Sequence, residues 1–522
     1  MTTISGRAAC LGAAAAVTLI AWTTGYAAAP TPAAALATPD RYSADAGAEI
    51  LGAGGNAADA AVAIAFTLAV TYPEAGNLGG GGFATVLFDG KADFLDYRER
   101  APASASADMY LDAAGKVIPE ASTVGAGAAG VPGTAAGIWE LHHRFGRLKW
   151  QADLAPAIRY AEQGFPVDRM LVEKRDARAA ALRGRTNFLT YYGALAEGYT
   201  FRQPELAATL KRIATDGPRG FYAGRTAELL LAEMAHSHGH MAATDLEAYR
   251  AVWRKPLEGE WAGYHLITAP LPSSGGIMLL SMLAMKADLA RAFAGVALNS
   301  AQYVHLVAEI EKRVFADRAS YLGDPDFTKA PVAQLLDPSY LARRAAEINT
   351  ERPTPTAQVK PGLAQHHDTT HFSVIDRFGN AVSNTYTLND DFGCGQVVTG
   401  AGFLLNNEMD DFSVKPDVPN IYGVVGGDAN AIAPGKRPLS SMTPTILTQG
   451  GQAAVIIGTE GGPSITTQVF QVLIAWHDLH MSLASAIAAP RVHHQLYPAD
   501  TLIEEPYALL EPTVRTALIA RG

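Results

Sequence analysis

The sequence predicts an α+β protein in which a helix-rich stretch precedes a strand-rich one. Hydrophobic residues make up 48% and charged residues 18% of the 522 residues, enough apolar material for a large core and too little charge for a disordered chain. Helical periodicity dominates from about residue 135 to 350. From residue 369 onward, short β-branched runs between glycine turns predict strands. We therefore expect two regions of different character that meet near residue 369.

The first 29 residues have the form of a secretory signal. Arg7 precedes an apolar stretch over about residues 8–22, and Ala27-Ala28-Ala29 offers a small-residue cleavage site. The apolar stretch is too short to span a membrane. We expect a signal peptide at 1–29, export to the periplasm or the medium, and a disordered leader at 30–39. An ordinary alanine-rich N-terminus is the alternative.

Two helices and a glycine run begin the folded part. Ser43-Ala44-Asp45-Ala46 predicts a helix start, with Asp45 near the N-terminal end of the helix dipole, and Gly54-Gly55-Asn56 predicts its end. Residues 57–70 predict a second, buried helix. The four glycines at 79–82, before a strand at 84–88, indicate backbone packed against backbone or against a ligand. They match neither a phosphate-binding loop nor a dinucleotide fingerprint.

The remaining elements follow from periodicity and turn signals. A polar, proline-containing stretch over 351–368 predicts a flexible linker between the two regions. Helices are expected at 205–215, 225–236, 301–319 and 465–477, and strands at 370–376, 381–388 and 453–458.

Charge and cysteine content exclude several classes of protein. The net charge is −10 and no run of Lys or Arg occurs, which argues against a nucleic-acid-binding protein. Cys10 and Cys394 are the two cysteines, too few for a disulfide framework or a cysteine-based metal site. Cys10 lies in the signal peptide, and Cys394 is predicted to be a buried packing residue.

The segment Asp368-Thr369-Thr370 allows two interpretations. β-Branched residues at a strand start are ordinary. Alternatively, cleavage before Thr369 would give a threonine whose free α-amine acts as the base for its own hydroxyl.

Such a nucleophile needs orienting groups and donors for an oxyanion. Thr385, Thr387 and Asn389 occupy alternate positions and are expected on one face of a strand. Gly461 and Gly462, between a strand and a helix, offer backbone N–H groups in the field of a helix N-terminus.

Two further clusters remain open on the residues alone. The acidic segment at 406–411 fits a metal-binding turn, a solvated turn or a site for a substrate cation. His366-His367 fits a metal site or a flexible tail beside a cleavage point.

The motifs, taken in order, resemble the γ-glutamyltransferase family (glutathione hydrolases), N-terminal nucleophile enzymes made as one precursor that cuts itself in two. The resemblance runs from about Asp40 to about Tyr497. The matching segments are residues 55–60, 76–83, 96–99, 272–276, 321–327, 369–373, 405–412, 437–444 and 461–462.

The resemblance implies a four-layer αββα sandwich built from two chains of one precursor. The large subunit would span 40–368 and the small catalytic subunit 369–522, with cleavage between Asp368 and Thr369. The implied reaction transfers γ-glutamyl from glutathione or other γ-glutamyl compounds to water, or to amino acid or dipeptide acceptors, through an acyl-enzyme. The resemblance implies no metal or organic cofactor.

The resemblance also assigns roles to residues that match the family's motifs. Thr369 would be the nucleophile, Thr387 the threonine that hydrogen-bonds it, and Gly461 and Gly462 the oxyanion hole. The substrate-binding set would be Arg98 and the hydroxyls of Ser440 and Ser441 for the α-carboxylate, Asn389, Glu408 and Asp411 for the α-ammonium, and Tyr422 in a lid over the substrate.

Two other functions compete with this interpretation. A glutaryl-cephalosporin acylase would share the scaffold without needing the full ammonium-binding set. An uncleaved, inactive binding protein is the second, and its support is the C-terminus: family chains extend several dozen residues past the motif at 491–495, and this chain stops at Gly522. Exposed sheet edges are expected there.

Overall fold

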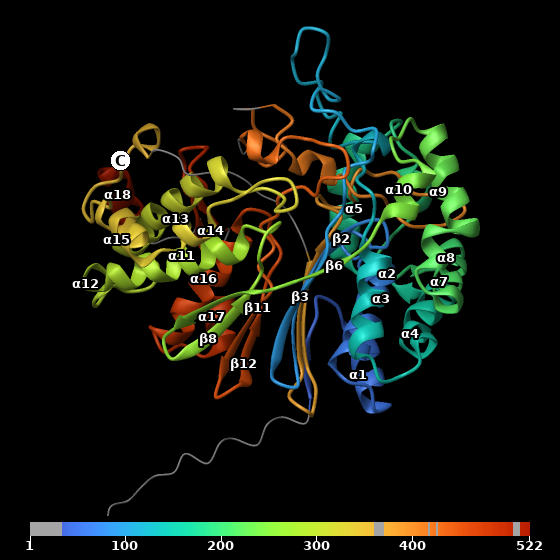
Figure 1. Ribbon diagram of the computed structural model, residues 1–522, viewed down its shortest axis with the longest axis horizontal. Coiled ribbons are helices and arrows are strands. Elements are labelled where there is room, and N and C mark those ends of the chain that lie inside the picture. The colour runs from blue at the N-terminus through green and yellow to red at the C-terminus, as the bar shows by residue number, and fades with distance from the viewer. Residues whose placement is uncertain (1–33, 360–369, 416–417, 424–425, 505–511) are drawn as a thin grey trace, which may run out of the picture.

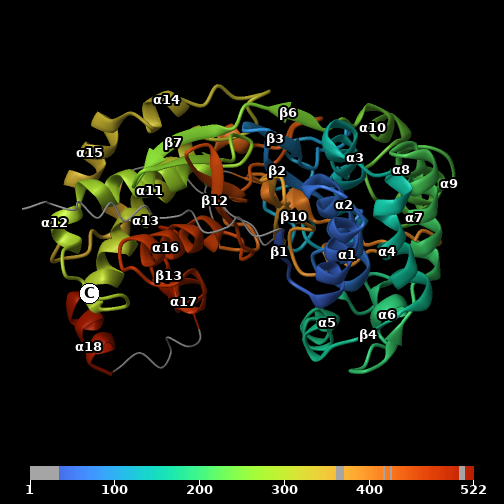
Figure 2. The ribbon, with the colours of Figure 1, turned by 90° about the horizontal axis from the view of Figure 1, so that it is seen from below.

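Two β-sheets lie face to face between two helical layers (Figure 1). The structure is a computed structural model that describes residues 34–359, 370–415, 418–423, 426–504 and 512–522. In Figure 1, α1–α4 lie on the right of the sheets, and α11, α13 and α16 on the left; the view from below agrees (Figure 2). The αββα arrangement expected from the resemblance is confirmed.

The first sheet has six strands in the order β1-β9-β10-β2-β3-β6, and every neighbouring pair is antiparallel. Its central strands come from both sides of residue 369. The bounds are β1 Ala35–Ala37, β2 Gly81–Phe88, β3 Lys91–Tyr97, β6 Val252–Arg254, β9 Thr370–Ile375 and β10 Ala381–Thr387.

The second sheet has four strands in the order β12-β11-β8-β7. It also mixes the two regions: β7 Leu257–Trp261 and β8 Tyr264–Thr268 precede residue 369, whereas β11 Thr445–Gln449 and β12 Gln452–Ile457 follow it. A buried cluster contains side chains of both sheets and so joins them: Leu87, Ile267, Ala381 and Ile446. A second buried cluster packs the first sheet against α16 and the loops next to β8 and β11: Phe83, Phe94, Ala269, Met442 and Ile465.

The glycine run allows the backbones of β2 and β10 to approach closely. A Cβ at Gly80 would lie 1.9 Å from the Thr387 carbonyl oxygen, and one at Gly82 would lie 2.4 Å from that of Thr385. The expectation of backbone packed against backbone is therefore confirmed. Strand β2 begins within the run, at Gly81, three residues before the predicted start.

Helix α2 is the centre of the layer that covers the first sheet. It spans Ala57–Thr71, and all of its residues are buried. Asn56 and Asp59 form a capping box that satisfies its first N–H groups. The Ala57 N–H donates to the Asp376 carboxylate at 3.0 Å, which ties this helix to the strand-rich region.

The other helices complete the two layers and their connections. The bounds are α1 Arg41–Gly52, α3 Thr134–Phe145, α4 Trp150–Gln163, α5 Arg169–Leu182, α6 Phe188–Tyr192, α7 Pro204–Asp216, α8 Arg219–Tyr222, α9 Gly224–His236, α10 Ala243–Ala248, α11 Gly275–Asp288, α12 Ala290–Phe293, α13 Ala301–Tyr321, α14 Val332–Leu335, α15 Pro338–Ala346, α16 Ser464–His477, α17 Leu483–Ala488 and α18 Pro512–Arg521. The short strands are β4 Phe165–Pro166, β5 Thr200–Phe201, β13 Val492–His493 and β14 Leu502–Ile503.

Three expectations about the first region were wrong. Residues 35–37 are strand β1, paired with β9, and so do not belong to a disordered leader. Helix α1 begins at Arg41 and is capped by Asp40, so Asp45 is not in its first turn. Strands β6–β8 interrupt the stretch expected to be mostly helical. These short segments are stabilised as strands by their partners in the two sheets, β6 in the first and β7 and β8 in the second.

The expected flexible linker is also partly wrong. Thr354 donates its hydroxyl to Glu309 at 2.7 Å, and its N–H donates to the same carboxylate at 3.0 Å. The first half of the linker is therefore fixed on α13, and Val359 is buried. Residues 360–369, which include His366, His367, Asp368 and Thr369, lie outside the described residues.

The remaining predictions hold with small shifts at the boundaries. The helices predicted at 205–215, 225–236, 301–319 and 465–477 are α7, α9, α13 and α16, and the strands predicted at 370–376, 381–388 and 453–458 are β9, β10 and β12. Cys394 is fully buried, as predicted. Among the described helices, none combines the length and apolar character needed to cross a bilayer.

Candidate active site

The first part of the site is the end of β10 beside the start of β9. Strand β9 begins at Thr370, which pairs with Tyr386, so Thr387 follows directly where the described pairing stops. The Thr387 Oγ accepts the Asn389 N–H at 2.7 Å, and its carbonyl accepts Asn77 Nδ2 at 2.8 Å. Thr387 is thus held by Asn77 and Asn389, one residue beyond the strand partner of Thr370.

The alternation of polar residues had predicted that Asn389 shares one face of a strand with Thr385 and Thr387. This prediction was wrong. Strand β10 ends at Thr387, and Asn389 has a φ of 80°, in the left-handed region that asparagine tolerates. Its Nδ2 donates to the Asn407 carbonyl at 3.0 Å. The turn thereby moves Asn389 from the strand toward the acidic segment at 406–411.

Gly461 and Gly462 lie between β12 and α16, as expected. Their φ angles are 121° and 59°, both in the region that favours glycine. Gly461 and Asn389 line one cavity of about 150 Å³ together with Glu74, Ala75, Lys174, Asp390, Asp391 and Glu460. The fold therefore brings Gly461 and Asn389, far apart in sequence, to one cavity.

The second part of the site is a buried cluster of one arginine and three carboxylates. Arg98, Glu99, Glu408 and Asp411 have no solvent exposure. The Arg98 guanidinium forms ion pairs with Glu408 at 2.7 Å, with Asp411, and with Glu99 at 3.5 Å. Arg98 Nε also donates to the Pro438 carbonyl at 3.3 Å, which joins the cluster to the loop that carries Ser440 and Ser441.

Burial and mutual repulsion set the protonation of this cluster. Burial raises the pKa of Glu99, Glu408 and Asp411, and the charge of Glu408 adds to the rise at Glu99 and Asp411. Burial lowers the pKa of Arg98, but the three carboxylates outweigh burial and raise it above its ordinary value. Arg98 is therefore a permanent cation that faces more carboxylates than it can neutralise.

The loop that carries Ser440 and Ser441, called the serine loop below, contacts Arg98 through the Pro438 carbonyl. Ser440 donates its N–H to the Pro272 carbonyl at 2.9 Å and accepts the Met442 N–H on its hydroxyl at 3.1 Å. The Ser441 hydroxyl accepts from Arg318 at 2.9 Å. Both serines are fully buried.

The described part of the loop around Tyr422 is tied to the neighbour of Asp411. The Ile421 N–H donates to the Asp410 carboxylate at 3.1 Å, and Ser122 donates to the same carboxylate at 2.6 Å. The Tyr422 carbonyl accepts from Gln495 at 3.2 Å. These contacts place Ile421 beside Asp410, and the role of Tyr422 in a lid stays a prediction.

Sequence reasoning missed four residues that the structure adds to this region. They are Glu99 beside Arg98, Asp410 under the Tyr422 loop, and Arg318 and Ser274 behind the serine loop. Glu99, Asp410 and Ser274 lay inside segments that had been singled out, at 96–99, 406–411 and 272–276, so the signal was present without an assigned role.

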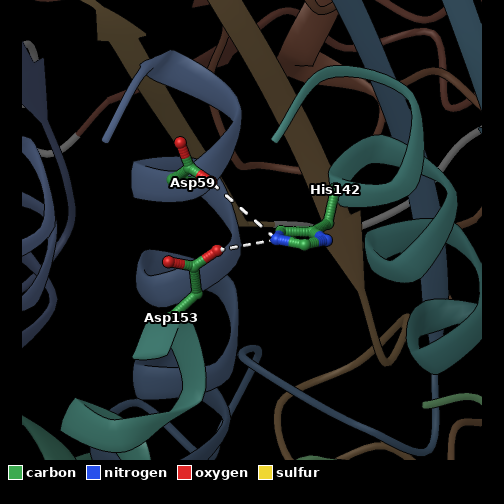
Figure 3. Close-up of side chains that lie close together, drawn as sticks. All are labelled: Asp59, His142 and Asp153. Carbon is green, nitrogen blue, oxygen red and sulfur yellow. Dashed lines mark ion pairs between the residues drawn. The ribbon is translucent and has the colours of Figure 1, made fainter. Parts of the chain in front are cut away.

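A separate cluster of possible metal ligands lies between α2, α3 and α4 (Figure 3). His142 Nε2 is 3.8 Å from Asp59 and 3.3 Å from Asp153. The Asp59 carboxylate already accepts N–H groups from Asn56, Arg147 and Leu148 at 2.8–3.1 Å. Its oxygens are thus occupied by backbone donors, and the cluster fits a helix junction better than a metal site.

Comparisons with known proteins agree on one family. The family described as gamma-glutamyltranspeptidase matches residues 43–522. The glutathione hydrolase proenzyme of Pseudomonas aeruginosa is 58% identical over 488 residues, which cover 94% of this chain and 87% of that protein.

Two solved structures are similar to this fold. The γ-glutamyltranspeptidase of Pseudomonas nitroreducens, complexed with L-DON, is 57% identical with a TM-score of 0.62, over 63% of this chain and 98% of that one. The cephalosporin acylase of Bacillus halodurans is 28% identical with a TM-score of 0.79, over 94% of this chain and 88% of that one.

Proposed function

Because this chain belongs to the γ-glutamyltranspeptidase family, we propose that it is a glutathione hydrolase and γ-glutamyltransferase that works through a threonine nucleophile. The observation that carries the proposal is the buried cluster of Arg98, Glu408 and Asp411 beside two serines. A γ-glutamyl group ends in an amino acid head with one positive and one negative charge. The cluster offers both complementary charges within one enclosed site.

Recognition of this head is an exchange of partners. In the structure Arg98 pairs directly with Glu408 and Asp411. A bound α-carboxylate would take the Arg98 guanidinium and the serine hydroxyls, and the α-ammonium would take Glu408, Asp411 and the Asn389 carbonyl oxygen. Each buried charge then keeps an opposite partner, which limits the cost of desolvation.

Catalysis then follows from the positions around Thr369. Cleavage of the Asp368–Thr369 bond would free the Thr369 α-amine, which takes the proton of the Thr369 hydroxyl as its oxygen attacks the γ-carbonyl carbon. Thr387 would orient that hydroxyl, and the N–H groups of Gly461 and Gly462 would stabilise the oxyanion. The amine of the γ-glutamyl amide then leaves with the proton held by the Thr369 α-amine. Water or an acceptor amine releases the γ-glutamyl group from the Thr369 ester.

We also propose that the protein is exported, because residues 1–29 have the form of a secretory signal. Removal of the signal and cleavage before Thr369 would leave a large subunit of 40–368, preceded by the leader, and a small subunit of 369–522. Both sheets contain strands of both subunits, so we infer that the two chains stay together as a heterodimer.

The acylase alternative has less support. The 58% identical relative is a glutathione hydrolase proenzyme, whereas the acylase structure is 28% identical. The ammonium-binding residues Asn389, Glu408 and Asp411 are all present, and a glutaryl substrate has no ammonium for them to bind.

The direct test is hydrolysis of γ-glutamyl p-nitroanilide by the purified protein and by Thr369→Ala. We expect release of p-nitroaniline by the wild type, and no release by the variant because it lacks the nucleophile. Faster hydrolysis of the glutaryl anilide than of the γ-glutamyl anilide would instead favour an acylase.

A further inference from the structure

Arg318 lies directly behind the serine loop, at the end of helix α13. Its side chain is buried, with Nε donating to the Ser274 hydroxyl at 2.5 Å and Nη2 donating to the Ser441 hydroxyl at 2.9 Å. Ser274 in turn donates its hydroxyl hydrogen to the Ser440 carbonyl at 2.8 Å. One guanidinium therefore reaches both residues of the serine pair, one directly and one through Ser274.

Packing of two loops fixes this arrangement. Ser273 and Ser440 form a parallel bridge, and the Ser273 hydroxyl donates to the Met442 carbonyl at 2.6 Å. A Cβ at Gly275 would lie 2.2 Å from the Thr443 hydroxyl, so a larger residue would push the loops apart. The glycine-containing segment at 272–276 thus serves to hold the serine loop against Arg318.

A guanidinium can only donate hydrogen bonds, and this fixes the direction of its partners. Ser441 must accept from Arg318, so the hydroxyl hydrogen of Ser441 points to another group. Ser274 also accepts from Arg318, and its own hydroxyl hydrogen is directed to the Ser440 carbonyl. Arg318 therefore limits the directions in which the Ser441 hydroxyl can donate to an acceptor such as a carboxylate.

The charge of Arg318 also lacks a direct counter-ion. Arg98 has three carboxylates around it, whereas Arg318 forms no ion pair with any residue that the structure describes, and its Nη1 has no hydrogen-bond partner there. Burial lowers the pKa of Arg318 well below its ordinary value, and the charge of Asp411 opposes this effect. An anion bound nearby would therefore be stabilised by Arg318.

We propose that Arg318 is a positioning residue for recognition of the substrate α-carboxylate, acting through the hydroxyls of Ser441 and Ser274. This inference rests on the proposed function. Two groups would then determine specificity for the α-carboxylate. Arg98 would bind it directly, and the serine loop, held in place by Arg318, would donate hydrogen bonds to it.

The test compares two anilides that differ by one group. γ-Glutamyl p-nitroanilide has the α-carboxylate, and 4-aminobutyryl p-nitroanilide lacks it. The ratio of their kcat/KM values is measured on matured wild type, Arg318→Met and Arg318→Lys. We expect Arg318→Met to reduce the ratio about 10- to 100-fold, chiefly through a higher KM for the γ-glutamyl substrate, because a charge-assisted hydrogen bond is lost. Arg318→Lys should restore part of the ratio.

Arg313→Met is the matched control, since Arg313 is also buried on α13 but pairs with Glu309. It should lower the thermal midpoint and leave the ratio unchanged. A ratio equal to wild type in the Arg318 variants, with only their stability reduced, would overturn the proposal. If those variants fail to mature, Ser274→Ala must still reduce the ratio, and an unchanged ratio there also overturns it. A wild type inactive on the γ-glutamyl anilide would instead contradict the proposed function.

Discussion

At the scale of single residues, the candidate site is defined by charges that the fold has removed from water. Arg98 and its three carboxylates have no exposure, so each is held by its neighbours and not by solvent. Such an arrangement is costly unless a ligand shares it, because uncompensated buried charge destabilises a fold. This is the physical reason to expect a zwitterionic ligand here.

Replacement of Arg98 by alanine should separate binding from self-cleavage. We expect kcat/KM for γ-glutamyl p-nitroanilide to fall by at least about 100-fold, since the cation proposed to bind the α-carboxylate is lost. The fraction of protein cut before Thr369 should fall much less. Kinetics normalised to the matured fraction, measured by gel densitometry, check this. Equal losses of cleavage and turnover would assign Arg98 a folding role.

The residue scale also shows what the sequence could not predict. Arg98, Glu408 and Asp411 lie in recognisable segments, so a resemblance could identify them. Arg318 and Ser441 are 123 positions apart, and their contact depends on how α13 meets a loop of the other region. Nothing in the local sequence around Arg318 or Ser441 indicates that the two side chains meet.

At the scale of elements, the junction of α2, α3 and α4 shows how one buried acid affects stability. Asp153 is fully buried and both of its carboxylate oxygens lack a hydrogen-bond partner among the described residues. Burial and then the charge of Asp59 raise the pKa of Asp153 from 3.8 to about 9. The folded protein therefore retains a proton on Asp153 that the unfolded chain releases.

This shift gives a signed pH dependence. Between about pH 4 and pH 9 the folded state binds more protons than the unfolded state at this site, so stability falls as the pH rises through that window. Asp153→Asn cannot ionise and should remove this contribution, with a gain on the order of a few kcal/mol at pH 8 and little gain at pH 4.

Thermal midpoints at pH 4.5 and pH 8 measure the effect, with the exposed Asp216→Asn as the control that should change neither value. The same difference between wild type and Asp153→Asn at both pH values would show that Asp153 is not protonated in the fold.

Element boundaries followed the sequence where local chemistry determines them. The apolar run at 57–70 predicts α2 to within one residue at its end, and the structure adds the capping box of Asn56 and Asp59 that fixes its start. Strands β7, β8 and β11 were missed because they are short. β7 and β8 form a hairpin, as do β11 and β12, but the pairing of β8 with β11 that completes the sheet joins segments far apart in sequence. The start of α1 was misplaced because Asp40, and not Asp45, supplies the cap.

At the scale of the whole molecule, the two sheets interleave the two regions of the chain. Strands β9 and β10 lie between β1 and β2. Strand β11 lies between β8 and β12 (Figure 1). Cutting one bond before Thr369 would leave all of these pairings in place. The sequence predicted the change of character near residue 369, but not this interleaving, because strand order depends on tertiary contacts.

Interleaved strands predict that the matured chains remain together. On size-exclusion chromatography under native conditions both chains should elute in one peak, and they should separate only under denaturing conditions, since separation would expose sheet edges and core. Native elution of a separate small chain would contradict the shared sheets.

The most direct test of the account is an intact mass combined with N-terminal sequencing of the purified protein. We expect two chains in the wild type, the smaller beginning Thr-Thr-His-Phe at Thr369, and one uncut chain in Thr369→Ala. A wild type that remains a single chain yet hydrolyses γ-glutamyl p-nitroanilide would contradict the threonine mechanism. So would cleavage of Thr369→Ala at the same bond.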